Sequence, residues 1–552
     1  MPLKAFMKIV ARIFLMKSTV GFSSDDFPIK NYSETYLNFP LFLNKQGWGY
    51  FTKYYNEKSV SNLIINPRDI LNYKTEILYG KKINSFDQYN LEVVSNSLLP
   101  ISIINEKISN EQDDKYIIKL KTDKVFSLEN LAQNRYYFFP IKSATTVSVS
   151  SEYPLVVGKP LALDQSIKHK KKLVLNIFID GLASEIFKDS SVEEMMPHSY
   201  NFFSNGFITL NSHINADWTI SSVPSIFSGL YPKNHKVHSR NNYESFGSGY
   251  KLISEIFQEN NYLTSQICSN YGKPPSMGYV KGFDRTIYQR SMSIDSIVSA
   301  FLDHMQTFCN RDNYVWLSIM DLHHFLDIVP AISTQKNISL QNSNYKDRKK
   351  KSVVPGQDLT RVERYIQELK RVDFYLKIIF DYIRENYSDE EVLVSLCSDH
   401  GQSYITKEET LFSEQRAMVP FMMKGTPKIF GMTDYRIDSI DLLPTILSFC
   451  DISYDEKIFD GFFPKFFGGG LDRKYSIAES IYPGKIYSAV ITSDSHRFYF
   501  ETINKVNPNG SFELKEYKTR IFNRVSGVDE SSILDYKVFF TKMIKEHILS
   551  KN

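Results

Sequence analysis

Three aspartates stand directly after short runs of mainly apolar residues, a pattern that places chemistry at the ends of strands. Asp180, Asp321 and Asp399 each end such a run, and His400 follows the last of them. In a parallel α/β sheet the carboxyl ends of the strands face one edge, where ligands bind. Carboxylates gathered there would repel one another unless a cation neutralised them, and Asp oxygens with a His nitrogen suit Mn²⁺, Zn²⁺ or Mg²⁺. The alternative for each Asp is a simple turn-capping role.

Thr219 is the candidate nucleophile because it stands just before a predicted helix. Val223, Ile226, Phe227 and Leu230 recur at the i, i+3, i+4 and i+7 spacing of one buried helix face. We expect Thr219 in the N-cap position, where its hydroxyl faces free backbone N–H groups and the positive end of the helix dipole. A metal on the same oxygen would make it an alkoxide-like nucleophile. A residue that only caps the helix is the alternative.

The elements that must position these residues alternate between strands and helices. The apolar runs are typical of strands buried on both faces of a parallel sheet, at residues 173–179, 314–320 and 391–398. Between the last two, residues 362–383 carry apolar side chains mostly three or four apart, as one face of a long helix does. The pattern predicts an α/β sheet with helices on both faces.

Residues 59–165 have a different residue pattern, with short apolar or alternating runs separated by Asn, Gly, Pro and Asp. This pattern predicts a small antiparallel β sandwich. We therefore expect an N-terminal helical or extended segment, an all-β accessory domain and a catalytic domain with a C-terminal subdomain, at residues 1–58, 59–165 and 172–552. The basic run 168–172 is expected to be a solvated linker. Glycan binding, oligomer contact and packing all stay open for the β domain.

The composition describes a large globular protein. Of 552 residues, 42% are hydrophobic and 23% are charged, which suffices for a sizeable core and excludes global disorder. The net charge of +4 gives no dominant basic field, so no nucleic-acid partner is expected. The four cysteines form no CxxC pair, and three of them, Cys268, Cys397 and Cys450, stand in apolar surroundings and are expected in the core, which favours a reducing, cytoplasmic location.

The N-terminal segment 1–22 raises the question of a membrane contact. It is largely apolar, but Lys4, Lys8, Arg12 and Lys17 interrupt it at near-helical spacing. No uncharged run in the chain approaches the roughly 20 residues that span a bilayer, so no transmembrane segment is expected. A basic amphipathic helix in peripheral contact with an anionic membrane and a helix packed on the protein itself both stay open.

From about residue 172 to residue 499 the chain resembles the sulfatase branch of the alkaline phosphatase superfamily. The similar pieces occur in the family's order, at Asp180-Gly181, 197–203, 218–222, 229–235, 282–284, 321–323, 398–401, 419–422, 438–445 and Asp460-Gly461. The resemblance implies that superfamily's sheet with helices on both faces. It also implies one divalent metal ion (Mn²⁺, Zn²⁺, Mg²⁺ or Ca²⁺) held by Asp180, Thr219, Asp399 and His400.

The nucleophile segment departs from that of sulfatases proper, which carry Cys or Ser in a C/S-x-P-x-R motif and convert it to formylglycine. Thr219 stands in that place, Ser221 replaces the proline and Val223 replaces the arginine. A threonine cannot become formylglycine. Threonine here is similar to the phosphoethanolamine and phosphoglycerol transferases, the lipoteichoic acid synthases and the nucleotide phosphodiesterases, which pass through a phosphothreonine.

The resemblance also implies residues that contact the substrate. His323 matches the sulfatase histidine that contacts the substrate anion or the leaving oxygen. His496 and Arg497 fall near the position of a sulfatase active-site lysine. The family's Gly-Lys-Trp-His segment is missing, and Lys273 is the candidate for substrate contact near that place.

A second metal site is left open. Relatives with two metals have a His four residues after the Asp of that site. Here Asp321 is followed by His323 and His324, and position 325 is Phe, so a second site at Asp321 and His324 looks incomplete.

We therefore expect a metal-dependent hydrolase or transferase that acts on phosphate esters or phosphodiesters through a phosphothreonine. Its substrate is expected to be a small molecule or a glycan- or lipid-linked ester, and modification of a bacterial surface glycan is one role that fits. A sulfatase-like hydrolase of sulfate esters is one alternative. A non-catalytic relative that binds glycan through the β domain is the other.

Overall fold

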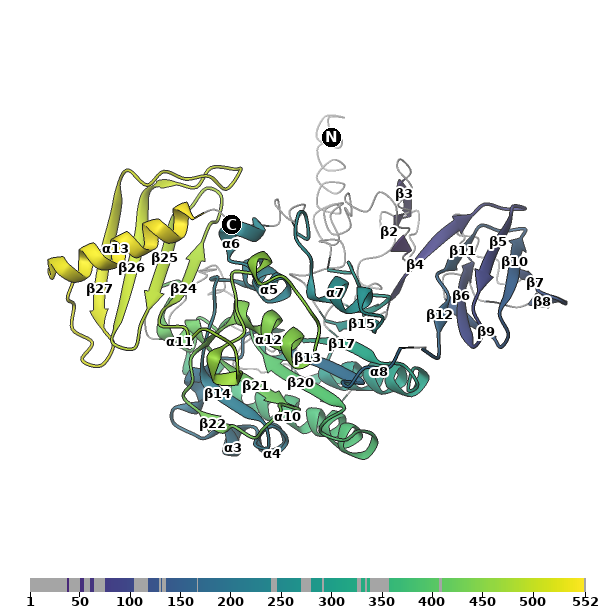
Figure 1. Cartoon of the computed structure of the whole chain (residues 1–552), viewed down its shortest axis with the longest axis horizontal. Helices are drawn as coiled ribbons and strands as arrows, with labels where there is room; N and C mark the ends of the chain where they lie inside the picture. The colour runs from purple at the N-terminus through teal and green to yellow at the C-terminus, as the bar shows by residue number, and fades with distance from the viewer. Residues whose placement is uncertain are drawn as a thin grey trace, which may run out of the picture. The chain divides into compact units, whose positions relative to one another are not determined.

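The computed structural model describes most of the chain from residue 75 onward and divides it into two compact units (Figure 1). The described residues are 75–103, 118–128, 131, 136–165, 167–239, 246–269, 279–289, 292–324, 357–406 and 410–550, with the backbone alone at 37–38, 50–53, 60–63, 329–332 and 335–337. The first unit comprises residues 1–168, 257–292 and 300–314, and the second comprises 169–256, 293–299 and 315–552. The segment 1–22 and Lys273 lie outside the described residues.

The sheet of the second unit contains the three predicted strands. Its order is β17-β13-β20-β21-β14-β22, with bounds Asn313–Ile319, Leu173–Ile179, Val392–Cys397, Met418–Lys424, Phe207–His213 and Gly431–Thr433. Every residue of β13, β17 and β20 is buried, as the continuous apolar runs predict. Strands β13 and β20 are parallel, whereas β21 runs antiparallel to both of its neighbours, β20 and β14. The sheet is therefore mixed at the side away from β17.

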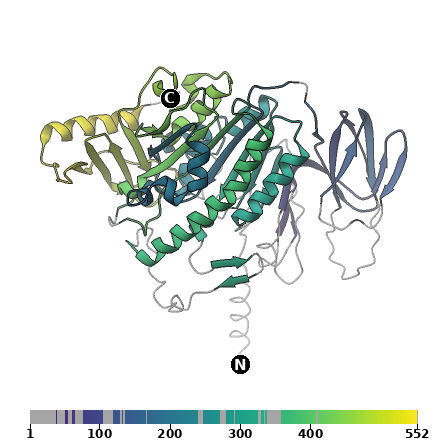
Figure 2. The same cartoon turned by 90° about the horizontal axis from the view of Figure 1, so that it is seen from below.

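Helices cover both faces of this sheet, which confirms the predicted α/β fold (Figures 1 and 2). One face carries α5 (Thr219–Ser228) and α12 (Leu442–Phe449), and the other carries α4 (Pro197–Phe203) and α10 (Leu359–Asn386). Helix α10 contains the predicted amphipathic stretch, and seven of its apolar positions are buried: Tyr365, Leu369, Val372, Leu376, Ile379, Phe380 and Ile383. Two acidic residues of the helix, Glu368 and Asp373, are buried as well. Phe380 stacks on Phe202 of α4, with ring centroids 4.2 Å apart.

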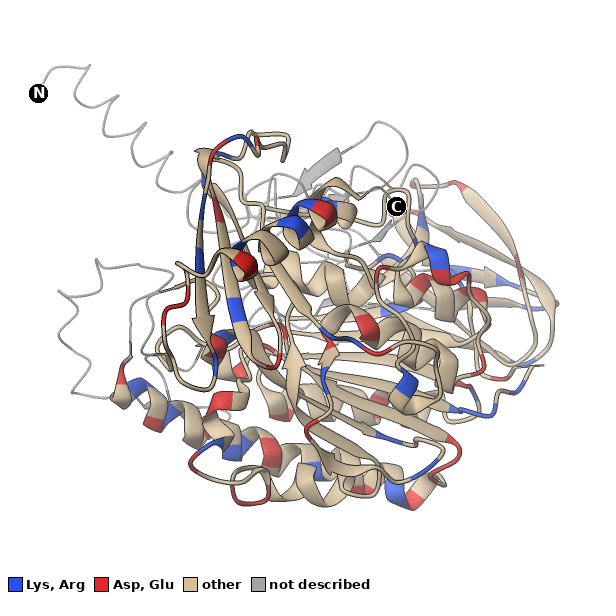
Figure 3. Cartoon of the chain, turned by 60° about the vertical axis from the view of Figure 1, so that its left-hand side comes forward, with Lys and Arg blue, Asp and Glu red and all other residues tan. Residues whose placement is uncertain are grey.

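A four-stranded antiparallel sheet follows in the C-terminal part of the second unit. Its order is β24-β25-β26-β27, with bounds Ser476–Ser480, Ile486–Thr492, His496–Lys505 and Tyr517–Asn523. Helix α13 (Leu534–Leu549) lies on one face and buries Phe540 and Ile544 against it. Figure 3 shows that acidic and basic residues lie mainly on the helices and loops rather than within the central strands.

The first unit contains the predicted β sandwich. One sheet has the order β5-β10-β7-β8, and the other runs β12-β6-β11-β4-β16-β15, with β9 beside β6. Their bounds are β4 Thr75–Ile83, β5 Gln88–Val93, β6 Ser97–Ile103, β7 Ile118–Lys121, β8 Val125–Leu128, β9 Tyr136–Ile141, β10 Thr145–Ser151, β11 Leu155–Gly158, β12 Leu161–Ala162, β15 Leu263–Cys268 and β16 Arg285–Tyr288. Residues of both sheets form one core, among them Leu99, Ile101, Val147 and Val149. The antiparallel pairing of β4 with β16 joins two segments that the sequence assigns to different domains, so the limits 59–165 and 172–552 stay predictions.

The basic run before β13 is not solvated along its whole length. Lys168 and Lys170 are exposed, but Lys171 is buried, and its ammonium group donates to the carbonyls of Val392 and Gly425 at 2.8 and 2.7 Å. The prediction of a solvated linker is therefore wrong for Lys171. This lysine anchors the chain just before β13, and the cost of burying its charge is reduced by the two hydrogen bonds.

The cysteines are mostly buried, as the sequence predicts. Cys268, Cys397 and Cys450 are buried and Cys309 is exposed, and all four are free thiols. Three of them are therefore core residues, as expected. Among the described residues, no helix combines the length and the apolar character needed to cross a membrane.

Candidate metal and nucleophile site

The ends of β13 and β20 bring together two carboxylates and an imidazole. One ligand atom from each of Asp180, Asp399 and His400 lies within 4.8 Å of the others, and all three residues are buried. Two buried carboxylates at this distance need a positive partner. Oxygen and imidazole ligands in this number suit a divalent cation. The donor set therefore fits the metal ion that the sequence predicts.

Thr219 lies against this cluster, but not in the predicted position. The N-cap of α5 is Trp218, Thr219 is the first helical residue, and no side-chain capping bond is present. Its Oγ1 lies 3.3 Å from Oδ2 of Asp180 and 3.1 Å from Nε2 of His400. The N-cap prediction is wrong by one residue. Because of that shift, the hydroxyl faces Asp180 and His400 instead of the helix N–H groups.

Helix α5 is also more deeply buried than its sequence pattern predicts. All residues from Ile220 to Ser228 are buried, so the helix packs on every side and not on one face only. The helix ends at Ser228, and Leu230 lies beyond it. A helix enclosed in this way is held rigidly, which suits a residue that must present its hydroxyl in a fixed direction.

The hydrogen bonds of His400 determine which of its ring nitrogens is a donor. Nδ1 lies 3.1 Å from the carbonyl oxygen of Gly401, which can only accept a hydrogen bond. Nδ1 therefore carries the hydrogen of the neutral ring, and Nε2 presents its lone pair. Nε2 faces Thr219 and lies 3.3 Å from Oδ2 of Asp399. A neutral imidazole fixed in this tautomer is suited to metal ligation.

The turn after β13 is shaped by a glycine with a positive φ. Gly181 has φ +78°, and a Cβ at this position would lie 2.0 Å from Nε2 of Gln402. Its N–H donates to Oδ1 of Asp399 at 3.1 Å, and its carbonyl accepts from the hydroxyl of Tyr365 at 3.0 Å. The glycine therefore lets the turn approach the loop of Asp399 and Gln402 closely, while Tyr365 of helix α10 also holds the turn.

Asp321 does not join the cluster, contrary to the expectation that three strand-end carboxylates gather around one cation. It begins α9 (Asp321–His324), and its Oδ1 accepts from Nη2 of Arg371 at 2.5 Å and from the N–H of Ile294 at 3.2 Å. Burial raises the pKa of Asp321 to about 7, and Arg371 opposes that rise. The guanidinium of Arg371 therefore supplies the positive charge that the sequence analysis assigned to a metal.

His323 follows on the same short helix and is exposed at the strand-end edge. The hydroxyl of Tyr404 lies 3.5 Å from the carbonyl oxygen of Leu322, which ties this turn to the loop after His400. The role of His323 at the leaving group stays a prediction. The side chain of His324 lies outside the described part of the chain, and with it the question of a second metal site at Asp321 and His324.

His496 and Arg497 have partners that belong to the C-terminal subdomain. Nε2 of His496 lies 2.9 Å from Oε2 of Glu530, and its ring packs against Tyr536. Arg497 is buried and donates to the carbonyl of Phe412. These contacts connect both residues to structural neighbours and not to the metal cluster, so their contact with substrate stays a prediction. So does that of Lys273.

Several residues that lie beside Thr219 in the structure were not predicted from the sequence. Asp217 is buried, its Oδ2 accepts from the hydroxyl of Ser480 at 2.9 Å, and burial raises its pKa while that bond acts against the rise. The rings of Trp218 and Tyr482 meet edge to face, with centroids 5.2 Å apart. The end of β24 therefore borders the loop that precedes Thr219. The only feature of the sequence that could have indicated Asp217 and Trp218 was their position directly before Thr219.

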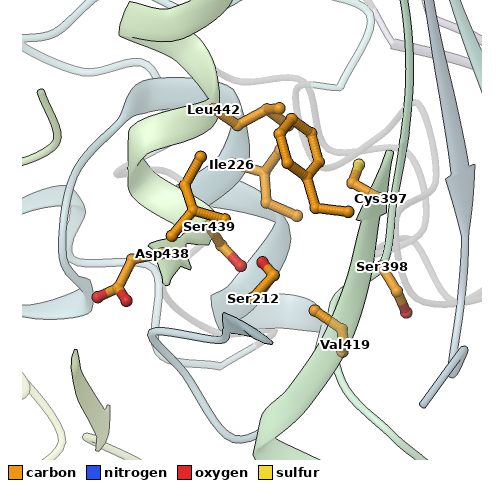
Figure 4. A pocket seen from close by; sticks show the side chains of 10 residues that line it. Ser212, Ile226, Cys397, Ser398, Val419, Asp438, Ser439 and Leu442 are labelled. Carbon is orange, nitrogen blue, oxygen red and sulfur yellow. The ribbon is translucent and has the colours of Figure 1, made fainter. Parts of the chain in front are cut away.

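A small cavity lies inside the second unit, beside the strand that leads to Asp399 (Figure 4). Its volume is about 10 Å³, and its lining includes Ser212, Ile226, Cys397 and Ser398. A cavity of that size holds one water molecule at most. It is therefore too small to hold a substrate.

Comparison with known proteins gives one family and several structures. Residues 172–452, slightly more than half of the chain, match the family model described as Sulfatase. The chain is similar to a phosphonate monoester hydrolase from Silicibacter pomeroyi (12% identity, 68% of this chain and 94% of that one, TM-score 0.52). It is also similar to a putative sulfatase, yidJ, from Bacteroides fragilis (14% identity, 70% and 96%, TM-score 0.50). At these identities the structures report the fold alone, and a search of curated proteins finds no match.

Proposed function

The chain belongs to the sulfatase family of the alkaline phosphatase superfamily, and we propose that within it the protein transfers phosphoryl groups through Thr219. The family makes it an enzyme that acts on sulfate or phosphate esters. The observation that carries the proposal is the position of Oγ1 of Thr219, 3.3 Å from Asp180 and 3.1 Å from His400. A threonine cannot supply the formylglycine of sulfatases proper, but its hydroxyl can form a phosphate ester.

Asp180, Asp399, His400 and Thr219 would hold one divalent ion in this proposal. Such an ion, when bound, supplies Lewis acidity that stabilises anionic oxygens and favours the ionised Thr219 hydroxyl. The chain's own contribution is the fixed geometry. Thr219 is the first residue of α5, so the transferred anionic group would also face the N-terminal end of that helix, where backbone N–H groups and the dipole favour negative charge.

The first step forms one bond to phosphorus and breaks another. Oγ1 of Thr219 attacks the phosphorus atom, and its hydrogen passes to the carboxylate of Asp180, toward which the hydroxyl points. The bond from phosphorus to the leaving oxygen breaks, and His323 donates a proton to that oxygen. The products are phosphothreonine and a free alcohol.

The second step returns the enzyme to its starting state. A water molecule or an acceptor hydroxyl attacks the phosphothreonine, and His323, now neutral, takes its proton. The bond between phosphorus and Oγ1 breaks, and Thr219 regains its hydrogen from Asp180. Water as acceptor gives a hydrolase, and an alcohol gives a transferase. We propose a glycan- or lipid-linked alcohol as the natural leaving group or acceptor, from the resemblance to transferases with threonine nucleophiles.

The test uses the full chain with Mn²⁺ and a panel of aryl phosphodiesters, aryl phosphomonoesters and aryl sulfates. We expect turnover of phosphodiesters or monoesters well above that of sulfates, and a phosphoryl group on Thr219 in intact-mass and peptide analysis after rapid quenching. Thr219→Ala should abolish both signals. Full metal-dependent phosphodiesterase activity in Thr219→Ala would refute the proposal, and turnover of sulfates above phosphates would favour the sulfate ester hydrolase instead.

A further inference from the structure

We infer that Arg416 is a positioning residue that fixes the nucleophile loop ahead of Thr219 against the loop that carries His400. The inference rests on the proposed function, because it assigns Arg416 to the geometry of that site. Arg416 lies on the short helix α11 (Glu414–Ala417) and is 4% exposed.

The guanidinium of Arg416 donates to three backbone carbonyls from three segments of the chain. Nε lies 3.2 Å from the oxygen of Gly401, Nη1 lies 3.1 Å from that of Leu411, and Nη2 lies 2.8 Å from that of Asp217. Because all three acceptors are backbone carbonyls, these hydrogen bonds fix the position of the main chain and not of side chains. Because the guanidinium is planar and rigid, one side chain sets the position of residue 217 relative to residue 401. These two positions lie two residues before the nucleophile and one residue after a proposed metal ligand.

Gly401 connects this contact to the imidazole of His400. Its carbonyl oxygen accepts from Nε of Arg416 and also from Nδ1 of His400, at 3.1 Å, and a carbonyl oxygen has two lone pairs for the purpose. The N–H of Gly401 donates back to the carbonyl of Arg416 at 2.8 Å. Arg416 therefore orients the acceptor that fixes the tautomer of His400, and with it the direction of the Nε2 lone pair.

The contact between Gly401 and α11 is too close for a side chain. A Cβ at Gly401 would lie 2.7 Å from the carbonyl oxygen of Gln415 and 2.8 Å from Cβ of Ala183. The loop after His400 is therefore pressed directly against the backbone of α11. This close approach lets the side chain of Arg416 reach past Gly401 to the nucleophile loop.

The charge of Arg416 is balanced by carboxylates of the site. Burial lowers the pKa of Arg416, and Asp217 and Asp399 act in the opposite direction. Asp217 is itself held by Ser480 at the end of β24. Replacement of Arg416 by a shorter or uncharged side chain would leave buried carbonyls without donors and would loosen both loops.

The experiment compares Arg416→Lys with Arg436→Lys in the full-length protein. Arg436 is a matched control, because it is also buried and donates to two carbonyls, those of Lys474 and Thr492, at 3.1 and 2.8 Å. Neither carbonyl belongs to the two loops of the site. We measure the affinity for Mn²⁺ alone by calorimetry, the melting temperature, and kcat and KM for an aryl phosphodiester. Arg416→Gln, which keeps an N–H donor, is measured as a second variant in case the lysine variant does not fold.

We expect Arg416→Lys to lower the Mn²⁺ affinity about 10-fold and kcat about 100-fold, with KM within about twofold of the wild-type value. Arg416→Lys and Arg436→Lys should lower the melting temperature by similar amounts. Arg436→Lys should leave the Mn²⁺ affinity unchanged. Equal Mn²⁺ affinity and equal kcat in the two variants would overturn the inference. Loss of Mn²⁺ affinity in Arg416→Lys, in a protein whose wild type shows no phosphodiesterase activity, would support the positioning role while refuting the proposed function.

Discussion

The hydroxyl oxygen of Thr219 lies 3.1 Å from Nε2 of His400, although 181 residues separate the two in the chain. The first residue of a buried helix and a residue three positions after the end of a buried strand are thus held within hydrogen-bond distance. Asp180, from the neighbouring strand, lies 3.3 Å from the same hydroxyl. The candidate nucleophile and two candidate metal ligands come from a helix and from the ends of two neighbouring strands of the sheet that it covers, and packing of all three elements keeps such a geometry fixed.

Metal binding should depend on Asp399. Asp399→Asn removes one of two buried negative charges, and we expect the Mn²⁺ affinity to fall by more than about 100-fold. Mutation of a residue that only hydrogen-bonds to a metal ligand already lowers metal affinity by up to about 100-fold. A ligand that binds the folded state alone raises the melting temperature. EDTA should therefore lower the melting temperature of the metal-loaded wild type and leave that of Asp399→Asn unchanged.

The control for this prediction is Asp389→Asn. Asp389 is exposed and pairs with Lys424 outside the metal cluster. This variant should bind Mn²⁺ like the wild type and should respond to EDTA in the same way. An Asp399→Asn variant that keeps the wild-type Mn²⁺ affinity would show that the cluster is not the metal site.

The turn after Asp180 should tolerate no side chain at residue 181. Gly181→Ala places a Cβ 2.0 Å from Gln402 and forces a non-glycine residue to φ +78°. Strain and overpacking of this kind together cost about 2–4 kcal/mol in the free energy of unfolding. Urea denaturation measures this loss. Because Gln402→Ala removes the clash but not the backbone strain, the double variant should recover part of the loss. Full recovery, or none, would contradict this division of the cost.

The strand ends and the long helix could be predicted from the sequence because burial leaves a local pattern. A strand buried on both faces is a continuous apolar run, and α10 repeats its apolar residues every three or four positions. The ends of β13 and β20 were therefore visible, and so were the Asp residues that follow them. The start of α5 was placed within one residue, but that residue decides whether the hydroxyl of Thr219 caps the helix or faces His400.

Partners that meet only in the folded chain could not be predicted. Asp321 resembles the other strand-end carboxylates, and its neutralisation by Arg371 depends on how α10 packs, 50 residues further along the chain. Arg416 lies in a helix of four residues, too short to show a period. Lys171 sits in a basic run that looks solvated, and its burial depends on the carbonyls of Val392 and Gly425.

The stability of the protein should depend on pH through Asp321. Burial raises the pKa of this carboxyl from 3.8 to about 7, so the folded state binds its proton more tightly than the unfolded chain does. The resulting stabilisation is complete below about pH 4 and is lost as the pH rises through 7. Between pH 5 and 8 the free energy of unfolding should fall more in the wild type than in Asp321→Asn, by up to a few kcal/mol.

Urea denaturation at pH 5, 6, 7 and 8 measures this difference. Asp295→Asn is the control, because Asp295 also faces Arg371, at 3.7 Å, while Asp321 remains in place. This control should keep most of the wild-type dependence on pH, because Asp295 is the smallest of the causes that raise the pKa of Asp321. Parallel profiles for the wild type and Asp321→Asn would contradict the prediction.

The aromatic pair beside the nucleophile should contribute to substrate binding. Trp218 directly precedes Thr219, and Tyr482 packs against its ring from the end of β24 while remaining 37% exposed. An exposed aromatic ring at this place offers an apolar face to the leaving group of a bound ester. Tyr482→Ala should raise KM for an aryl phosphodiester about 3- to 10-fold with kcat within about twofold, since a contact made equally in the ground and transition states affects KM alone. Tyr482→Phe keeps the ring and should retain the wild-type KM. A Tyr482→Ala variant that loses kcat at unchanged KM would instead indicate that the ring supports the position of Thr219.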